Sequence, residues 1–460
     1  MECFKPLDIR GQVPNQLNET IAWRIGRAFV EELQAKTVVV GHDIRLTSPS
    51  LTASLARGMA SAGAKVIHIG EVGTEEVYFA VQHLKVDGGI MVTASHNPKD
   101  YNGMKLVREE AKPVSSDTGL WSIRDRVQAD ESVDDESLGE PWVHDDTRPA
   151  YVEHVLSYVD VSQLPPFKVV SNPGNGAAGP VVEALAARLP FDWVKVAHEP
   201  DGHFPNGVPN PLLPENRPMT TEAVAGEQAD FGLAWDGDFD RCFFFDEKGR
   251  FIEGYYVVGL LAEAFLNRAK ASGQSMKIVH DTRLTWNTID IVRKAGGEPI
   301  EGKTGHAFMK ERLRQEQAVY GGEMSAHHFF QDFGYCDSGM IVWLLVAELM
   351  ASTGKPLSEL VDERMQAYPC SGEINFTIGS PEQVMASIES HFDEASANGE
   401  PLVRKGFIDG LTMEFERWRF NLRKSNTEPV VRLNVETRGD EALLAEKIEL
   451  MQSLIEQYGQ

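Results

Sequence analysis

The 460-residue sequence is short of cysteine, of long apolar runs and of basic residues. Its four cysteines, Cys3, Cys242, Cys336 and Cys370, show no CxxC spacing, so neither a disulfide framework nor a zinc site is indicated. No run reaches the roughly 18 apolar residues of a membrane span, and the N-terminus lacks the basic and apolar regions of a signal peptide. We therefore expect a cytoplasmic protein with no membrane partner.

Basic residues are scarce: 44 Lys and Arg stand against 69 Asp and Glu, which gives a formal charge of −25. Because nucleic acids and anionic membranes bind to basic surfaces, this balance argues against a nucleic-acid partner. The same acidity makes any local cluster of Arg and Lys informative. A small anionic ligand would need such a cluster to overcome the background field.

The length predicts three or four domains at about 150 residues per domain. Apolar residues make up 42% and charged residues 25%, as in globular chains. The first part alternates between the two periodicities, with predicted strands at 36–40, 65–69 and 89–93 and predicted helices at 51–62 and 74–83. Thr74 is the expected N-cap of the second helix. This βαβαβ run predicts a mainly parallel sheet, followed by an exposed linker or edge structure at 128–149.

Two further α/β units follow and suggest weakly related internal repeats. The second has predicted strands at 167–171, 231–234 and 242–245 and a helix at 181–187. The third has predicted helices at 255–271 and 286–294 and strands at 276–280 and 318–320. The C-terminal part is predicted to be α+β, with strands at 406–415, 418–422 and 430–436 and a helix at 441–457. The fold class is therefore α/β, with three mixed α/β/α domains and a C-terminal α+β domain, at 1–150, 151–253, 254–368 and 369–460.

A serine follows the third predicted strand in the motif Thr93-Ala94-Ser95-His96-Asn97-Pro98. Pro98 opposes continuation of the strand, so Ser95 is presented at a turn. A polar turn without function is the usual explanation for a lone serine in this position. No GxSxG elbow surrounds it, which argues against an acyl-enzyme hydrolase.

Three carboxylates, Asp236, Asp238 and Asp240, follow another predicted strand at alternate positions. Such a loop can direct oxygens toward one hard cation. A calcium-binding EF-hand is a rival, although Arg241 stands where that loop needs glycine. A phosphatase-type aspartate nucleophile and a plain surface turn also compete with a metal site. The nearby serine motif favours the metal site, because a phosphate on serine needs a cation during transfer.

Two later loops carry groups suited to a sugar phosphate. Glu323 and Ser325, in Gly322-Glu323-Met324-Ser325, could bind vicinal hydroxyls, whereas His327 and His328 lack zinc partners at metal spacing. The loop from Arg423 through Ser425, Asn426 and Thr427, followed by Arg432, offers a grip for a phosphate dianion. A solvated basic turn would have the same composition.

Taken together and in this order, the motifs resemble those of the α-D-phosphohexomutase superfamily, and the resemblance spans the chain. Within it the sequence is similar to bacterial phosphomannomutases of GDP-mannose and surface-polysaccharide synthesis, because Gly322-Glu323-Met324-Ser325 precedes His327. The resemblance implies four domains around a central cleft, the last acting as a lid. It also implies Mg²⁺, hexose phosphates as small-molecule partners, a hexose 1,6-bisphosphate activator, and a monomer or homodimer.

The resemblance implies that Ser95 is phosphorylated and that Mg²⁺ binds its phosphate together with Asp236, Asp238 and Asp240. Arg241 would lie beside the transferring group. Lys105 matches the family's candidate general base, with Arg10 nearby. A lysine base requires a depressed pKa, which we expect a neighbouring arginine to help provide.

The resemblance also implies roles for the later loops. The residues expected to face the sugar are Arg283, His306, Glu323, Ser325 and His327. The residues expected to hold the phosphate that is not transferred are Arg423, Ser425, Asn426, Thr427 and Arg432. Two departures are Leu7, where relatives usually have Tyr, and Phe239, which replaces a usual glycine and puts the backbone of the metal loop in doubt.

These features predict a phosphohexomutase that prefers mannose phosphates. A phosphoglucomutase or dual-specificity mutase, a phosphatase, and a non-catalytic sugar-phosphate binding protein stay open as rival functions.

Overall fold

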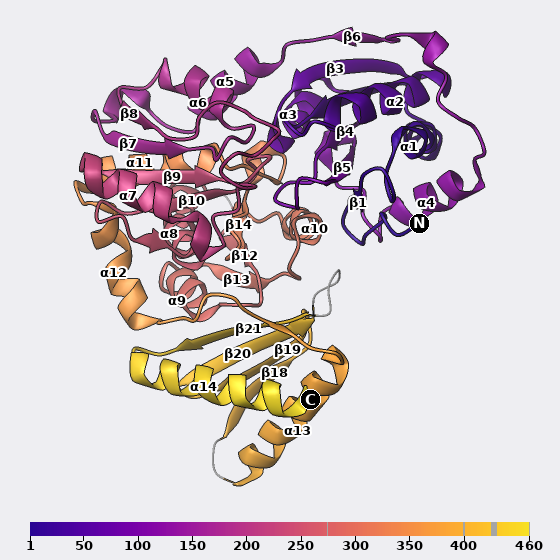
Figure 1. The fold of residues 1–460 in the computed structure, drawn as a ribbon. Helices are drawn as coiled ribbons and strands as arrows, with labels where there is room; N and C mark the ends of the chain where they lie inside the picture. Colours follow the sequence, from indigo (N-terminus) through magenta and orange to yellow (C-terminus); the bar gives the residue numbers. More distant parts are fainter. Residues whose placement is uncertain (274, 399–400, 425–429, 460) are drawn as a thin grey trace. The chain divides into compact units, whose positions relative to one another are not determined.

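The computed structural model describes residues 1–273, 275–398, 401–424 and 430–459. The chain divides into two compact units. Unit 1 comprises Met1–Ile252 and Ser325–Leu357, and unit 2 comprises Glu253–Met324 and Ser358–Gln460. Along the chain, three segments of mixed α/β structure precede one α+β segment (Figure 1).

The first segment, in unit 1, is a six-stranded sheet with the order β1-β5-β4-β2-β3-β6. Strands β4, β2, β3 and β6 are parallel, and β5 is antiparallel to β4 and β1. Its strands are β1 (Ile9–Gln12), β2 (Thr37–His42), β3 (Lys65–Glu71), β4 (Gly88–Val92), β5 (Tyr101–Arg108) and β6 (Trp142–His144). Its helices are α1 (Glu19–Leu33), α2 (Ser48–Ser61), α3 (Thr74–Leu84), η1 (Glu109–Ala111), α4 (Leu120–Ala129) and η2 (Glu136–Leu138). The predicted βαβαβ run is confirmed, and the stretch predicted as linker or edge contains β6 at the sheet edge.

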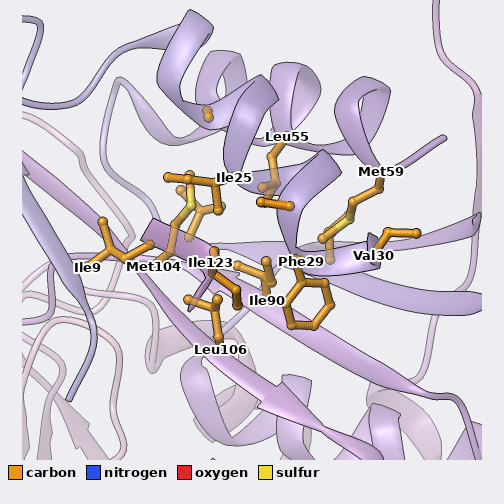
Figure 2. Packing of buried hydrophobic residues seen from close by; sticks show 14 of the residues in the cluster. Ile9, Ile25, Phe29, Val30, Leu55, Met59, Ile90, Met104, Leu106 and Ile123 are labelled. Carbon is orange, nitrogen blue, oxygen red and sulfur yellow. The ribbon is translucent and has the colours of Figure 1, made fainter. Parts of the chain in front are cut away.

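The core of this segment lies between the sheet and the helices α1 and α2. Figure 2 shows Ile25 and Phe29 of α1 and Leu55 of α2 together with Ile90 of β4 and Leu106 of β5, all in one buried cluster. The four-residue spacing of the two α1 residues places them on the same face of the helix. Each buried side chain of this size stabilises the fold by roughly 1.5–3 kcal/mol.

The second segment of unit 1 is a five-stranded sheet with the order β11-β10-β9-β7-β8. Strand β7 is parallel to β8 and β9, and β10 is antiparallel to β9 and β11. Its strands are β7 (Lys168–Asn172), β8 (Asp192–Lys195), β9 (Phe231–Trp235), β10 (Cys242–Phe245) and β11 (Phe251–Ile252). Its helices are α5 (Arg148–Leu156), η3 (Val161–Gln163), α6 (Gly179–Ala186), η4 (Pro214–Asn216) and α7 (Pro218–Glu227). All of β9 is buried, and the aspartate loop that directly follows it is buried as well.

The last part of unit 1 is hydrogen-bonded to α3 and β9. It contains β15 (His328–Phe330), η5 (Gln331–Phe333), β16 (Cys336–Asp337) and α11 (Ile341–Thr353). The buried carboxylate of Glu75, in the first turn of α3, accepts from Ser338 Oγ at 2.6 Å and from the Gly339 amide at 2.5 Å. Trp235 Nε1 at the end of β9 donates to the Gly339 carbonyl at 3.0 Å. These bonds explain why this stretch belongs to unit 1.

Unit 2 begins with the parallel strands β13, β12 and β14. The bounds are β12 (Lys277–His280), β13 (Glu298–Glu301), β14 (Tyr320–Gly322), α8 (Gly254–Ser272), α9 (Trp286–Lys294), α10 (His306–Glu316) and α12 (Leu357–Ala367), which starts at the unit boundary. The predicted helix at 286–294 and the predicted strand at 276–280 are confirmed.

The C-terminal segment is an antiparallel sheet with the order β17-β21-β20-β19-β18. Its elements are β17 (Ile374–Thr377), α13 (Pro381–Asn398), β18 (Leu402–Gly406), β19 (Leu411–Phe415), β20 (Trp418–Lys424), β21 (Val430–Thr437) and α14 (Glu441–Tyr458). Phe392 of α13 and Ile455 of α14 join Phe420 in one core, so both helices cover the same face (Figure 1). The single strand predicted at 406–415 is wrong: the chain turns between β18 and β19, and Gly410 takes a φ of 74°.

The α/β fold class with an α+β end is confirmed, whereas the central cleft, the lid and the four domain boundaries stay predictions. Among the described residues, no helix combines the length and the apolar character that crossing a membrane requires.

Candidate active site

Ser95 stands three residues after the fully buried strand β4. Its side chain is almost completely buried, and its φ of 48° is in the left-handed region that non-glycine residues rarely adopt. The hydroxyl donates to Asp236 Oδ2 at 2.7 Å and lies 3.0 Å from His96 Nδ1. Backbone strain of this kind is concentrated at functional sites. The predicted presentation of Ser95 at a turn after a strand is confirmed.

The aspartate loop directly follows β9. The three buried residues Asp236, Asp238 and Asp240 offer ligand atoms that all lie within 4.8 Å of one another. Gly237 allows this loop to approach the serine loop, because a Cβ there would come within 2.4 Å of the Ser95 carbonyl oxygen. The loop continues into β10, which is antiparallel to β9. An EF-hand, whose loop joins two helices, is therefore excluded.

The donor set fits a hard divalent cation. All three groups offer only oxygen, as Mg²⁺ prefers. The buried Oδ1 atoms of Asp238 and Asp240 have no hydrogen-bond partner among the described residues. A buried carboxylate oxygen without a partner is costly, and a bound cation would remove that cost. The acidic cluster could thus hold a metal ion.

Cationic side chains surround the carboxylates. Arg241 Nη2 donates to Asp236 Oδ2 at 2.6 Å, and Lys105 Nζ lies 2.7 Å from Asp238 Oδ2 and 2.5 Å from Asp240 Oδ2. Burial, and then the neighbouring charge of Asp238, raise the pKa of Asp240 to about 6.

The depressed pKa predicted for Lys105 is wrong in this arrangement. Burial opposes the charge of the ammonium, but Asp238 and Asp240 outweigh burial and raise the pKa of Lys105 above its ordinary value. Arg10, expected to help lower it, acts in that direction with a smaller effect. Its guanidinium donates to Asp8 at 2.8 Å and also to Asn97 in the serine loop. With these partners Lys105 is a fixed positive charge.

His327 completes the cluster of unit 1. Its Nδ1 lies 2.7 Å from Asp337 Oδ2 and 3.9 Å from Asp240 Oδ1. The sequence showed no ligand partners for this histidine at metal spacing, yet the fold brings two carboxylates to it within 4.8 Å. Ser325 is also in unit 1 and is half-buried. The 2.7 Å contact is an ordinary hydrogen bond that fixes the ring of His327.

A second group of predicted residues meets in unit 2. Glu323, buried after β14, accepts from the Gly305 amide at 2.8 Å, directly before His306 at the start of α10. Arg283 Nη2 lies 3.6 Å from Glu323 Oε1 and 2.5 Å from Asp281 Oδ2. The structure therefore brings Arg283, His306 and Glu323 together.

The basic cluster gathers around an acid that the sequence did not reveal. Glu373 Oε2 accepts from Arg423 Nη2 at 2.6 Å, and Glu373 Oε1 accepts from Arg432 Nη1 at 3.2 Å. Arg283 Nη1 lies 3.8 Å from the same carboxylate. Burial opposes ionisation of Glu373, but the three arginines outweigh it and lower the pKa of this carboxyl. The other predicted phosphate ligands, Ser425, Asn426 and Thr427, lie outside the described residues.

Sequence reasoning also missed two residues of the unit 1 site. Thr74, predicted as an N-cap, is the first residue of α3; Gly73 is the cap, and the Thr74 hydroxyl donates to Asp238 Oδ2 at 2.6 Å. His96 was given no role, although it adjoins Ser95. Burial, and then Arg241 and Arg10, hold the pKa of His96 well below its usual range, so its Nδ1 can accept the 2.5 Å contact from Arg241 Nη2.

Profiles of known protein families match consecutive parts of the chain from its first residue to residue 451. The profiles described as phosphoglucomutase/phosphomannomutase alpha/beta/alpha domains I, II and III match residues 1–134, 149–249 and 253–368. The profile of the C-terminal domain matches residues 373–451. The four matches follow one another in the order of the four segments.

Individual proteins with the same family names are also similar to this chain. A protein named "Phosphohexose mutases" from Xanthomonas campestris pv. campestris is 57% identical over 458 residues, covering 99% of both chains. The phosphomannomutase of Escherichia coli K12 is 55% identical over 462 residues, again covering 99% of both. A crystal structure of a phosphoglucomutase/phosphomannomutase family protein from Burkholderia thailandensis is 31% identical, with a TM-score of 0.85 over 99% of this chain and 97% of that one. Since both the sequence identity and the four consecutive domains extend over nearly the full length, the chain belongs to the phosphoglucomutase/phosphomannomutase family.

Proposed function

We propose that the chain is an Mg²⁺-dependent phosphomannomutase that interconverts mannose 1-phosphate and mannose 6-phosphate through phospho-Ser95 and a hexose 1,6-bisphosphate. The observation that carries the proposal is the bond from Ser95 Oγ to Asp236, inside a buried carboxylate triplet flanked by Arg241. Full-length relatives named phosphomannomutase support mannose as the sugar. The product would feed GDP-mannose and surface-polysaccharide synthesis.

The reaction exchanges one phosphoryl group in each direction. The phosphorus–oxygen bond of phospho-Ser95 breaks as a hydroxyl of the hexose phosphate forms a bond to the same phosphorus. The hexose bisphosphate then turns end for end, and its other phosphate returns to Ser95 Oγ. Phosphoryl transfer depends mainly on positioning and charge neutralisation. When bound, Mg²⁺ supplies part of that neutralisation at the three aspartates, and Arg241 supplies a fixed positive charge beside Asp236.

The hydroxyl proton needs an acceptor in each half-reaction. The Lys105 ammonium contacts Asp238 at 2.7 Å and Asp240 at 2.5 Å, so in this arrangement it is directed at the aspartate loop. We assign this step to His327, whose ring is held by Asp337 at 2.7 Å and lies 3.9 Å from the metal loop. Lys105 then contributes charge.

The groups of unit 2 are suited to the parts of the substrate that do not react. Glu323 offers carboxylate oxygens to two vicinal hydroxyls, and His306 adjoins it. Arg423 and Arg432 both pair with one acid, Glu373, and Arg283, which also pairs with Asp281 and Glu323, lies 3.8 Å from it. The guanidinium groups of Arg423 and Arg432 suit a phosphate dianion, because arginine can donate two hydrogen bonds to it at once.

The test is a coupled assay of mannose 1-phosphate with Mg²⁺ and a catalytic amount of hexose 1,6-bisphosphate, run beside glucose 1-phosphate. Ser95→Ala removes the proposed phosphate carrier. Ser137→Ala is the matched control, because it removes an exposed hydroxyl that, among the described residues, donates to Asp135. We expect turnover in the wild type and the control and none in Ser95→Ala.

The outcomes separate the rival functions. Equal rates with mannose and glucose phosphates would indicate a dual-specificity enzyme, which the name of the Xanthomonas relative favours. Release of free phosphate without isomerised product would indicate a phosphatase. Binding of the sugar phosphate without turnover would leave a binding protein.

A further inference from the structure

The same six-residue pattern, His-Asp-x-Arg-Leu-Thr, occurs at 42–47 in unit 1 and at 280–285 in unit 2. Each copy starts at the last residue of a central parallel strand, β2 or β12. His42 pairs in register with Val92 at the end of β4, and His280 pairs with Gly322 at the end of β14. Three residues beyond these partners stand Ser95 and Ser325. The two patterns therefore lie beside equivalent loops.

The two copies form the same turn. In each, the histidine Nδ1 lies 2.8 Å from the carbonyl oxygen of the following aspartate. The arginine amide donates to that aspartate at 3.0 Å in the first copy and at 3.1 Å in the second. In the second copy the remaining oxygen, Asp281 Oδ2, accepts from the Met324 amide at 2.9 Å. The aspartate thus holds the backbone of the loop that follows the neighbouring strand.

In the first copy Asp43 reaches the serine loop through one hydroxyl. Thr93 Oγ1 donates to Asp43 Oδ2 at 2.7 Å and accepts from the Ser95 amide at 2.9 Å. All three side chains are at most 2% exposed. The amide side of Ser95, whose φ is 48°, is fixed by this chain of bonds.

Arg45 fixes the carbonyl group of Ser95. Its guanidinium, on a side chain that is 1% exposed, donates to four carbonyl oxygens of the serine loop. They are those of Ser95 at 2.9 Å, Asn97 at 2.6 Å, Pro98 at 2.7 Å and Tyr101 at 2.9 Å. Arg283, by contrast, turns its guanidinium to Asp281 and Glu323. Arg45 also lies 3.4 Å from Asp43 Oδ2, so the arginine of the first copy joins that aspartate to the loop backbone.

We infer that Asp43 and Arg45 are positioning residues for phosphoryl transfer, which hold Ser95 in its left-handed backbone so that Oγ points at Asp236. This inference rests on the proposed function. Neither side chain touches the serine hydroxyl. They act through Thr93 Oγ1 and through the Ser95 carbonyl, from opposite ends of the residue. Displacement of a reacting atom by about 1 Å can lower a rate by about 100-fold. Loss of the bonds that position Ser95 should therefore lower the rate of phosphoryl transfer measurably.

A matched pair at Thr93 tests the inference. Thr93→Val removes both hydrogen bonds with little change in shape, and Thr93→Ser keeps them. Arg45→Lys removes the four-carbonyl grip but keeps the charge. For each protein we would measure kcat and KM for mannose 1-phosphate, the melting temperature, and the fraction of Ser95 phosphorylated by labelled hexose 1,6-bisphosphate.

The expected result is a kcat per phosphorylated site about 100-fold lower in Thr93→Val and in Arg45→Lys, with KM changed by less than about threefold. Thr93→Ser should keep the wild-type value. A purely structural role would lower the melting temperature while kcat per phosphorylated site stayed normal, and this would overturn the inference. If Arg45→Lys fails to fold, the comparison of Thr93→Val with Thr93→Ser still tests the inference. If the wild type itself lacks mutase activity, the proposed function fails, which is a distinct outcome.

Discussion

The ring of Phe239 lies against Gly73, where an added Cβ would come within 2.1 Å of ring carbon Cε1. Phe239 is fully buried in the middle of the aspartate loop, and its φ is 49°. This left-handed backbone explains why a glycine is usual at the position. The adjacent Thr74 amide donates to the Asp238 carbonyl at 3.1 Å. The start of α3 thus supports the loop that holds the metal ligands.

We expect Gly73→Ala to destabilise the protein and weaken metal binding. The new methyl group would displace the ring of Phe239, and overpacking of this kind costs about 1–3 kcal/mol. Thermal unfolding and calorimetric titration with Mg²⁺ would measure the two effects. Gly226→Ala in α7 is the control, because no atom of the described residues outside the neighbouring turns of that helix lies within 4 Å of its Cβ position, and a helical alanine is favoured. Equal melting temperatures and equal Mg²⁺ affinities in the two variants would show that the start of α3 does not support the aspartate loop.

The parts of the site that the sequence predicted depend on local patterns. Ser95 and Asp236 each follow a short apolar run that becomes a buried strand, so position along the chain is enough to place them at strand ends. The prediction of one strand at 406–415 is wrong because Gly406 and Gly410 flank a turn. That turn contains apolar residues, so its sequence resembles that of a strand. Phe407 in that turn is 63% exposed although it is hydrophobic.

The parts that the sequence missed depend on partners far along the chain. Burial lowers the pKa of Lys105, and the charges that raise it above its ordinary value belong to Asp238 and Asp240, which are 133 and 135 residues away. Glu373 is recognisable only once the fold has placed three arginines around it. No local spacing carries such information. The repeated His-Asp-x-Arg-Leu-Thr pattern is the exception, since it could be found in the sequence although its meaning comes from the strand register.

Removal of the Lys105 charge should make stability depend more strongly on the metal. In Lys105→Met, Asp238 and Asp240 stay buried and lose the ammonium that contacts both. An uncompensated buried charge costs about 3–5 kcal/mol, and Mg²⁺ on the same carboxylates would restore part of the balance. We therefore expect the melting temperature to fall more in EDTA than in excess Mg²⁺. An equal fall in both conditions would show that Lys105 and the metal do not share these carboxylates.

Stability should fall in mild acid because of His68. This side chain is 8% exposed, and its Nδ1 accepts from the Gly70 amide at 3.0 Å. Burial, followed by His42 and His144, lowers the pKa of His68 from 6.5 to about 4. Between these two values the unfolded chain binds a proton that the folded chain does not. Stability is therefore complete above pH 6.5 and is lost progressively as the pH falls toward about 4.

The loss amounts to at most about 3 kcal/mol, because each unit of pKa difference corresponds to about 1.4 kcal/mol. Melting temperatures measured across this pH window would show it. His68→Asn is the informative variant, since its amide oxygen can accept from Gly70 and does not titrate. The variant should show a shallower decline with falling pH. Parallel curves for the two proteins would assign the acid sensitivity to other groups.

A large stability effect is also expected at Arg419 in unit 2. Its side chain, 1% exposed, donates to Glu436 Oε1 at 2.6 Å and to the carbonyl oxygens of Arg283 and Thr282, both at 2.8 Å. Glu436 also accepts from the Thr285 amide at 2.7 Å. The C-terminal sheet therefore holds the loop that carries Arg283. Arg419→Met should lower the free energy of unfolding by about 3–5 kcal/mol, because Glu436 keeps a buried charge without its partner.

Urea unfolding of the full chain would measure this loss, with Arg417→Met as the control. Arg417 pairs with Asp440 at the surface, where its side chain is 64% exposed, and such pairs contribute less than about 1 kcal/mol. The double variant Arg419→Met with Glu436→Gln removes both charges and should recover part of the stability. If the double variant is no more stable than Arg419→Met alone, the loss comes from the broken bonds to the Arg283 loop and not from an unpaired charge.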